Sequence, residues 1–239
     1  MNLDLTDYRR QGNMMPLRKT DCLLFFVAFL GCLTPLVQSA PATQSAPFAG
    51  EIAAFQKADA RRMPPKDANL FVGSSSIRFW TTLADDFPGI PVINRGFGGS
   101  MLPDCVRYAD RIVIPYHARR IFVYGGDNDL AAGHTPEQVL ADFKAFVRTV
   151  RAAQPKVPIY FLAIKPSPAR VKLLGRMREA NKLVKTYAQG AADVHFIDVF
   201  TPMLGSDGQP RAGLFRADKL HMNKEGYALW TRLIMPLLK

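Results

Sequence analysis

The chain has 239 residues, of which 48% are hydrophobic and 21% are charged, a globular composition that excludes a fibrous repeat or wholesale disorder. Its 31 Lys and Arg residues outnumber 20 Asp and Glu residues, which gives a net charge of +11. Three cysteines are too few for a dense disulfide framework, and no Cys-x-x-Cys or Cys/His cluster indicates structural zinc. We therefore expect a basic globular protein that uses no metal and no other cofactor.

Residues 1–42 have the pattern of a secretory signal peptide. Two basic residues precede an apolar run at residues 22–33, and a small-residue site ending at Ala42 follows it. The run is shorter than the roughly 20 apolar residues of a membrane-spanning helix, so we expect cleavage after Ala42 and a secreted or periplasmic protein. Two alternatives stay open: an uncleaved N-terminal anchor helix, and a lipoprotein that carries its lipid on Cys32.

Removing this leader leaves the protein strongly basic. The leader takes away four basic and three acidic residues, which leaves a charge of +10, and Cys105 is the one cysteine that stays. A start of translation at Met14 or Met15 would shorten the leader and make residues 1–13 a mis-annotated extension. The remaining basic residues are scattered and no nucleic-acid motif accompanies them, so we expect no nucleic-acid partner and only weak association with an anionic membrane surface.

The rest of the chain reads as one domain at residues 51–239, joined to the leader by a tether at residues 43–50. Five short apolar runs predict strands, at residues 70–72, 91–93, 121–124, 159–164 and 194–200. Helices are predicted at residues 51–62, from the capping box at 135–138, at 170–187 and after Asn223. Apolar strands that alternate with amphipathic helices indicate an α/β fold with a parallel sheet covered on both faces.

Ligands of such sheets bind beyond the carboxyl ends of the strands, so the residues that follow each run are the candidates. Three serines, at residues 74–76, follow Gly73 after the first run. A serine at a strand-to-helix turn can act as a nucleophile, and a serine-rich helix cap is the plainer interpretation. We expect Ser74 to cap the helix. The Gly-x-Ser-x-Gly elbow of the α/β-hydrolases is not met, because Ile77 occupies the second glycine position.

Glycines and an asparagine follow the next two runs. Three glycines between residues 96 and 99 let backbone amides approach a ligand, and no lysine follows them as in a nucleotide-phosphate loop. The Asn128 side chain can donate a hydrogen bond into a site, although an Asx turn is the alternative. Adjacent carboxylates at residues 127 and 129 also suggest a metallophosphoesterase, which is disfavoured because the Asp-x-His at residues 193–195 comes late.

An aspartate and a histidine precede the last predicted helix. The spacing of Asp218 and His221 puts a carboxylate and an imidazole in one turn, where the carboxylate can accept from one ring nitrogen while the other faces a nucleophile. His134 lies in a loop that we expect to border the site. Arg170 follows the fourth run and could bind an anionic group of the substrate, with a surface or helix-start arginine as the alternative.

In this order, the motifs Gly-x-Ser, Gly, Gly-x-Asn-Asp and Asp-x-x-His resemble those of the SGNH, or GDSL-type, hydrolase family across residues 69–230. The resemblance implies a three-layer α/β/α fold with strand order 2-1-3-4-5 and metal-free ester hydrolysis. It implies that Ser75 is the nucleophile and that Asp218 and His221 are its supporting pair. It also implies that Ser75, Gly99 and Asn128 are the oxyanion-hole donors. The sequence departs from the family pattern at Ser74, which replaces the Asp of Gly-Asp-Ser and blurs which serine acts.

The resemblance implies a serine esterase or acylhydrolase that acts on a small-molecule ester. The resemblance covers short-chain esters, acyl lipids such as lysophospholipids, thioesters and acetylated sugars, and no residue here selects among them. A carbohydrate O-deacetylase of the same fold is the first alternative. A non-catalytic protein that binds lipid or carbohydrate is the second, and nothing in the sequence favours it because every catalytic position is filled.

Overall fold

The computed structural model describes residues 47–238, so the predicted signal peptide, Cys32 and the first residues of the tether lie outside the described part. The described residues group as one compact unit. Its centre is a five-stranded, all-parallel sheet with the order β2-β1-β3-β4-β5, which confirms the predicted fold. In chain order the strands are β1 (Asn69–Gly73), β2 (Val92–Gly96), β3 (Arg120–Tyr124), β4 (Ile159–Leu162) and β5 (Val194–Ile197).

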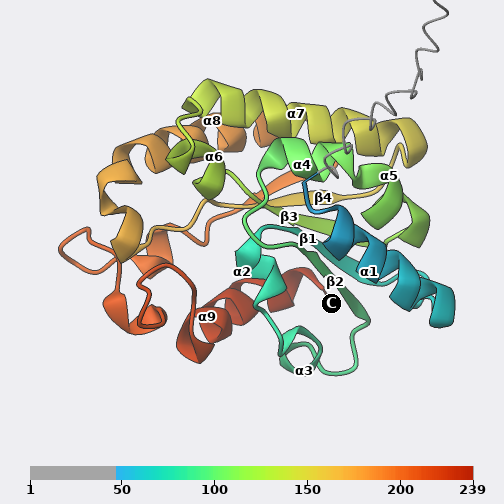
Figure 1. Ribbon diagram of the computed structural model, residues 1–239. Helices are drawn as coiled ribbons and strands as arrows, with labels where there is room; N and C mark the ends of the chain where they lie inside the picture. Colours follow the sequence, from blue (N-terminus) through green and yellow to red (C-terminus); the bar gives the residue numbers. More distant parts are fainter. Residues whose placement is uncertain (1–46, 239) are drawn as a thin grey trace, which may run out of the picture. The chain divides into compact units, whose positions relative to one another are not determined.

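Helices cover both faces of this sheet (Figure 1). One face carries α4 (Leu102–Arg107), α5 (Ala109–Ile112), α7 (Pro136–Ala153) and α8 (Leu174–Gly190), with α6 (Asp127–Ala131) after β3. The other face carries α2 (Ser75–Arg78), α3 (Leu83–Asp86) and α9 (Lys224–Ile234), and α1 (Ala49–Arg61) packs against α5. Short 3-10 turns lie at Ile114–Tyr116, Pro168–Leu173, Thr201–Met203, Ala212–Leu214 and Met235–Leu237.

The strand register aligns the places where the chain leaves the sheet. Gly73, the last residue of β1, pairs with Gly96 of β2 and with Tyr124 of β3, so the three strands end at one level. The segments that follow them therefore start side by side at one edge of the sheet. This alignment is why motifs about 25 residues apart in the chain can form one site.

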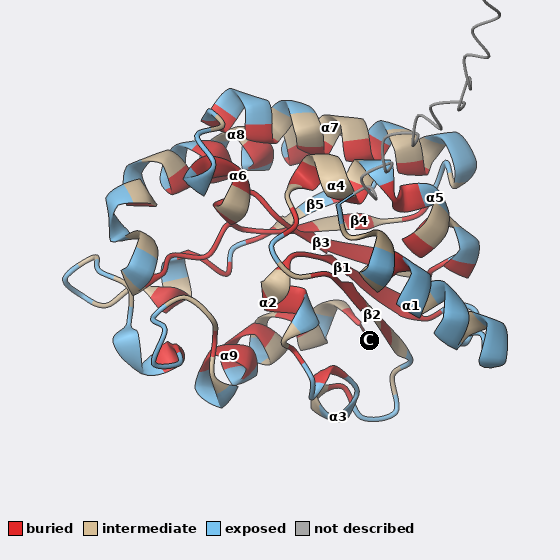
Figure 2. Ribbon diagram, viewed as in Figure 1, coloured by how far each residue is buried: buried red, intermediate tan, exposed pale blue. Residues whose placement is uncertain are grey.

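The core consists of the central strands and the inward faces of the helices, and β1 and β3 are red along most of their length in Figure 2. Every residue of β1 is buried, as expected of a central strand covered on both sides. An aromatic cluster joins the segment directly after α2 to α9, because the Trp80 ring lies 5.2 Å from that of Tyr227 and 5.9 Å from that of Trp230. The Tyr227 hydroxyl also donates to the Ser76 carbonyl oxygen at 3.0 Å, so α9 is fixed to the helix that follows β1.

Several predicted boundaries were wrong. The first helix begins at Ala49, so the last two residues of the predicted tether are helical. The helix predicted from Arg170 begins at Leu174, because Pro168 opens a 3-10 turn and Arg170 has non-helical φ and ψ of −120° and 27°. Strands β4 and β5 end earlier than their apolar runs. The helical segments α4, α5 and α6 were not predicted; each is six residues or fewer, too short for a clear periodicity.

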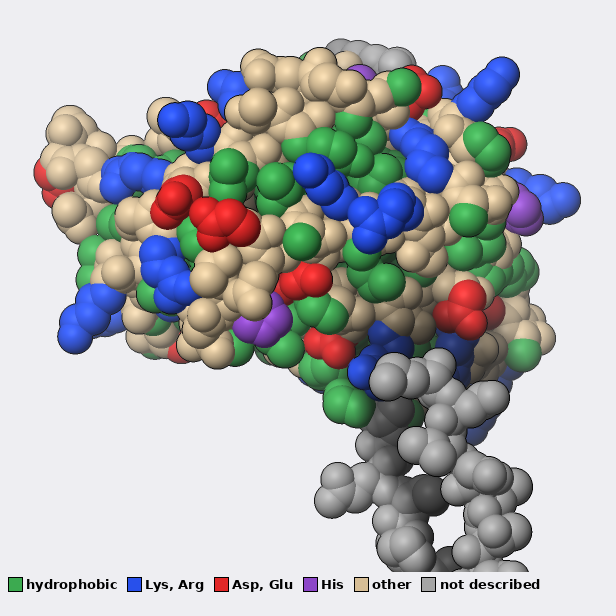
Figure 3. Space-filling model, turned by 90° about the horizontal axis from the view of Figure 1, so that it is seen from above, with side chains coloured by type: hydrophobic (Ala, Val, Ile, Leu, Met, Phe, Trp, Pro, Cys, Tyr) green, Lys and Arg blue, Asp and Glu red, His purple; other side chains and the backbone are tan. Residues whose placement is uncertain are grey.

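The surface carries charges of both signs. Figure 3, seen from above, shows Lys and Arg side chains spread over this face with Asp and Glu among them, in agreement with the scattered basic residues of the sequence. Within residues 47–238, no helix combines the length and the apolar character that crossing a bilayer requires.

Candidate active site

The turn after β1 exposes one serine of three. Gly73 has a φ of +138°, and a Cβ atom there would lie 1.9 Å from the Tyr124 carbonyl oxygen, so this position requires glycine. Ser74 is the N-cap of α2, as predicted, but its buried hydroxyl makes no capping hydrogen bond. Ser76 is buried as well, whereas Ser75 is only half-buried. As the first residue of α2, Ser75 also has a backbone N–H without an intrahelical acceptor.

The structure brings Ser75, His221 and Asp218 together in one chain of hydrogen bonds. The Ser75 Oγ lies 3.1 Å from His221 Nε2, and His221 Nδ1 lies 2.7 Å from Asp218 Oδ2. Hydrogen bonds from the His221 ring and from the backbone N–H groups of His221 and Leu220 hold the pKa of Asp218 well below its usual range. Because an ionised carboxylate only accepts, Nδ1 carries the proton of the neutral imidazole, and in that form Nε2 presents a lone pair to the Ser75 hydroxyl.

The loop that carries His221 is fixed by its own backbone. Lys219 has a φ of 58°, which reverses the chain between Asp218 and His221. The Arg216 N–H donates to the His221 carbonyl oxygen at 2.8 Å, and Phe215 forms an isolated bridge with Met222. Asn223 then caps α9 by accepting from the Gly226 N–H at 3.0 Å. Asp218 and His221 therefore sit in a closed turn directly before a helix, which limits how far the imidazole can move.

Phe79 is a site residue that the sequence reasoning missed. Its ring meets the His221 ring edge-on at 4.8 Å between centroids, and the Arg216 guanidinium lies 5.1 Å from the Phe79 ring centroid. The available signal was an aromatic residue one helical turn after Ser75. This ring packs the imidazole against α2 and so helps to hold it near the Ser75 hydroxyl.

Asn128 contacts the loop that carries Gly99. Gly99 has a φ of +79° and is exposed in the loop after β2. Asn128, in the first turn of α6 after β3, donates from Nδ2 to the Ser100 carbonyl oxygen at 3.0 Å. An amide NH₂ has two protons, so a second N–H of Asn128 remains for another acceptor. The alternative of an Asx turn is not met, because Asn128 lies in the first turn of α6.

A buried group of charges lies behind Asn128. The Asp127 Oδ2 atom is 3.3 Å from Lys165 Nζ and 2.9 Å from Arg170 Nη1. Burial by itself would raise the pKa of Asp127, but Lys165 and Arg170 outweigh that effect and lower it. Burial lowers the pKa of Lys165, and Asp127 opposes that decrease. The Arg170 guanidinium contacts Asp127 and Asn128, and its suggested contact with an anionic group of the substrate stays a prediction.

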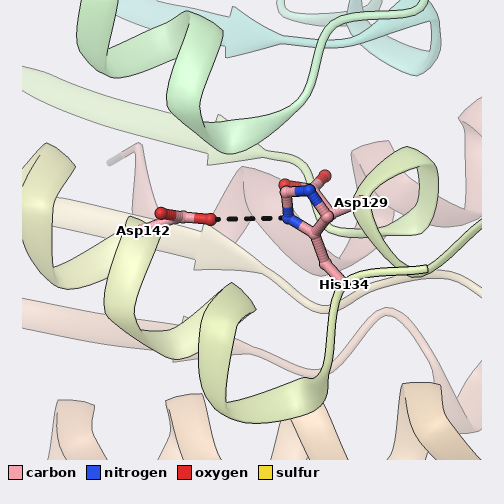
Figure 4. Close-up of side chains that lie close together, drawn as sticks. All are labelled: Asp129, His134 and Asp142. Atoms are coloured by element: carbon pink, nitrogen blue, oxygen red, sulfur yellow. Dashed lines mark ion pairs between the residues drawn. The ribbon is translucent and has the colours of Figure 1, made fainter. Parts of the chain in front are cut away.

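His134 belongs to a different cluster from the one around Ser75. Figure 4 shows its ring between Asp129 and Asp142, with Nδ1 3.8 Å from Asp142 Oδ2. These three side chains place one candidate metal-ligand atom each within 4.8 Å of one another. Both Asp129 oxygens, however, already accept backbone N–H groups, from Leu102 at 3.0 Å and from Gly126 at 2.9 Å. The arrangement is therefore explained by the fold of the α6 turn, and the expectation that His134 borders the site stays a prediction.

With this geometry in place, the sequence can be compared with known families. The model of the GDSL-like lipase/acylhydrolase family matches residues 70–229. This chain belongs to that family. Membership in the GDSL family implies a hydrolase that acts on ester bonds, and the matched range contains all the motifs from Gly73 to His221. Among curated proteins, none matches the chain in sequence.

Solved structures share the fold of this GDSL-family chain. A Streptococcus pneumonia protein whose name refers to platelet activating factor is 19% identical, with a TM-score of 0.70 over 80% of this chain and 92% of the other. A GDSL-like lipase from Bacteroides thetaiotaomicron is 18% identical, with a TM-score of 0.67 over 78% and 96%. A family 3 carbohydrate esterase from Clostridium thermocellum is 14% identical, with a TM-score of 0.57 over 73% and 98%. At these identities the likeness establishes the fold alone.

Proposed function

We propose that this chain is an exported serine esterase or acylhydrolase with Ser75 as nucleophile, His221 as general base and acid, and Asp218 as the residue that orients His221. The observation that carries the proposal is the hydrogen-bonded chain from Ser75 Oγ through His221 to Asp218, with separations of 3.1 and 2.7 Å. The three groups have the mutual reach that nucleophilic catalysis at an acyl carbon needs.

In the proposed reaction, Ser75 Oγ bonds to the acyl carbon while its proton passes to His221 Nε2. The tetrahedral intermediate then expels the alcohol, which leaves with that proton, and an acyl-serine remains. Water attacks the acyl carbon by the same route, gives its proton to Nε2, and releases the acid as Ser75 regains the proton. Asp218 stays ionised throughout and stabilises the imidazolium that forms in each half.

The negative charge of the intermediate requires donors that are already in position. We assign this role to the backbone N–H groups of Ser75 and Gly99 and to Nδ2 of Asn128. Support comes from the unbonded N–H expected at the first position of α2 and from the contact of Asn128 with the Gly99–Ser100 loop. In this mechanism the three donors and His221 supply all the polarisation that the ester needs.

Because the proposed mechanism contains no metal step, we expect chelator treatment to leave ester hydrolysis unchanged. The measurement is initial rate before and after incubation with EDTA and desalting. Inactivation that is reversed by adding back a divalent metal would contradict the mechanism and would direct attention to Asp129, His134 and Asp142.

The identity of the nucleophile can be tested by changing each serine in turn. We expect Ser75→Ala to abolish labelling by a fluorophosphonate and to lower turnover by about 10⁴ or more, as for residues that act as a unit. Ser74→Ala and Ser76→Ala serve as matched controls and should keep labelling, because both hydroxyls are buried. Loss of labelling in Ser74→Ala alone would move the nucleophile by one residue, and wild-type protein that neither labels nor hydrolyses esters would favour a non-catalytic binding protein.

The substrate is proposed to be a small-molecule ester, either an acyl lipid such as a lysophospholipid or an acylated sugar. The carbohydrate esterase among the structures of similar fold is the reason to keep O-deacetylation as a second candidate. Rates on acyl esters of graded chain length, on lysophospholipid and on acetylated sugar would separate the two. Turnover that is appreciable only with the acetylated sugar would establish the deacetylase.

The location of the protein is also a proposal, since residues 1–42 lie outside the described range. We propose export with cleavage after Ala42, and weak binding to anionic membrane surfaces through the net charge of the remaining chain. Intact-mass measurement of the native protein should show the loss of residues 1–42. Retention of the apolar run, or a lipid-modified N-terminus at Cys32, would support the anchor or the lipoprotein instead.

A further inference from the structure

Arg170 makes two contacts that involve the proposed oxyanion-hole residue. Its Nη2 donates to the Asn128 Oδ1 atom at 2.8 Å, and its Nη1 lies 2.9 Å from Asp127 Oδ2. The Arg170 side chain is 17% exposed and that of Asp127 is 5% exposed, so both contacts are largely shielded from water. The guanidinium thus bridges two consecutive residues at the start of α6.

This bridge determines which end of the Asn128 amide faces the loop after β2. An arginine only donates, so the atom that it contacts on Asn128 has to be the oxygen. The NH₂ group consequently points the other way, where it donates to the Ser100 carbonyl oxygen at 3.0 Å. A flipped amide would place NH₂ against the guanidinium and would lose both hydrogen bonds. Arg170 therefore favours the one orientation in which Asn128 can donate to an oxyanion.

The charges nearby act in the same direction. Lys165 is 1% exposed and lies 3.3 Å from the same Asp127 oxygen that Arg170 contacts. One carboxylate is thus shared by two basic side chains, so these three groups together carry one formal positive charge. Because electrostatic interactions are stronger in a shielded environment than in water, this arrangement would favour negative charge on the substrate side of Asn128.

The segment that carries Arg170 also reaches the other half of the site. The Ala169 N–H donates to the Lys219 carbonyl oxygen at 3.0 Å, and Lys219 lies between Asp218 and His221. The 3-10 turn at Pro168–Leu173 thereby holds Arg170 at a fixed position relative to the histidine loop. This single turn therefore contacts Asn128 through Arg170 and the loop that carries His221 through Ala169.

We infer that Arg170 is a positioning residue of the oxyanion hole, which acts through Asn128 by fixing the direction of its amide and placing positive charge behind it. This inference rests on the proposed function and deepens it. It assigns Arg170 to the stabilisation of the intermediate, where the sequence suggested that it binds an anionic group of the substrate. The two roles predict different kinetics, since stabilisation of the intermediate affects kcat and binding of the ground state affects KM.

The first test compares Arg170→Met with Arg170→Lys on a neutral short-chain ester. We expect Arg170→Met to lower kcat about 10–100-fold while KM changes less than about threefold, because one donor of the oxyanion hole becomes misdirected. Arg170→Lys, which keeps one charged donor, should recover part of that loss. Arg151→Gln is the matched control, since Arg151 bonds only backbone carbonyls near the amino ends of β4 and β5, and it should keep wild-type kcat. An unchanged kcat with a raised KM in Arg170→Met would overturn the inference.

The second test is a double-mutant cycle of Arg170→Met with Asn128→Ala. If Arg170 acts through Asn128, the double variant should turn over within about threefold of Asn128→Ala alone. A further loss of about tenfold or more would show that Arg170 acts by itself and would overturn the inference. If Arg170→Met does not fold, Arg170→Lys takes its place in the cycle under the same criterion.

The cycle is interpreted only after Ser75→Ala has proved inactive. An active Ser75→Ala refutes the proposed function, whereas an additive cycle with an inactive Ser75→Ala refutes the role of Arg170 alone.

Discussion

Asp218 and Asp127 are two aspartates of the same site that keep their charge in opposite ways. The Asp218 side chain is 47% exposed and is stabilised by hydrogen bonds from its own turn and from His221. The Asp127 side chain is 5% exposed and is stabilised by Lys165 and Arg170, which come from a different part of the chain. We therefore expect loss of the exposed carboxylate to affect folding little, and loss of the buried one to leave uncompensated charges that destabilise the fold.

The largest expected difference between the two is in catalysis. Asp218→Asn should lower kcat about 10⁴-fold, because the neutral amide no longer fixes the ring tautomer or stabilises the imidazolium. Its free energy of unfolding should change by less than about 1 kcal/mol, since the lost interaction is exposed. Steady-state kinetics and urea unfolding on the same preparation test both parts. A kcat within about tenfold of wild type would remove Asp218 from the mechanism.

Asp127→Asn should have the opposite pattern, with a larger effect on the free energy of unfolding than on kcat. It leaves two basic groups without their carboxylate in a buried place, which costs about 3–5 kcal/mol of unfolding free energy. The double change Asp127→Asn with Lys165→Met removes one uncompensated charge and should regain part of that loss. A loss below about 1 kcal/mol in the single variant would mean that water or rearrangement relieves the charges, and that the buried set is not a stability unit.

Asn128→Ala tests the proposed oxyanion-hole donor that follows Asp127 in the chain. Loss of one oxyanion-hole donor should lower kcat by roughly 10²–10³ with only a small change in stability. Asn69→Ala is the control, because Asn69 donates to the Pro91 carbonyl oxygen at the amino end of the sheet and should leave kcat unchanged. A decrease in kcat of less than about threefold in Asn128→Ala would show that Asn128 is a helix-start residue and not an oxyanion-hole donor.

The smallest expected effect is a pH dependence of stability. The pKa of Asp127 is lowered in the folded protein from its ordinary 3.8, so its contribution is present above that pH and is lost as the pH falls through the folded value. The difference in unfolding free energy between wild type and Asp127→Asn should therefore be constant from about pH 5 to 8 and shrink below about pH 4. A difference that grows on acidification would show that the sign is wrong.

Much of the fold and the central part of the site could be predicted from the sequence. Apolar strands and the capping box at Thr135 are local signals, and the structure bears them out with α7 starting at Pro136. Ser75, Asp218 and His221 were recognisable because their motifs stand directly after a strand or before a helix. The parallel register aligns the segments after β1, β2 and β3, and the contact of Tyr227 with Ser76 fixes α9, and with it the preceding histidine loop, to the helix that begins with Ser75.

The rest depended on contacts between distant segments. The pairing of Arg170 with Asn128 spans 42 residues and needs a 3-10 turn, where the sequence pattern favoured a helix from the same residue. Phe79 was missed because its role comes from an edge-on contact with a histidine far along the chain. The grouping of His134 with Asp129 and Asp142 was not predicted either, because it joins a loop to α6 and α7. Burial and partner choice at these positions are tertiary properties that a local pattern does not encode.

The aromatic cluster at α9 gives the protein an intrinsic fluorescence signal that reports on the site. Trp80 and Trp230 are the two tryptophans of the whole sequence, and they lie in contact between the helix that begins with Ser75 and the helix that follows His221. Both indoles are fully buried, so native emission should be blue-shifted, with a contribution from coupling between the two rings. Any variant or solvent that separates the serine half of the site from the histidine half would change this signal, even where the rest of the sheet stays folded.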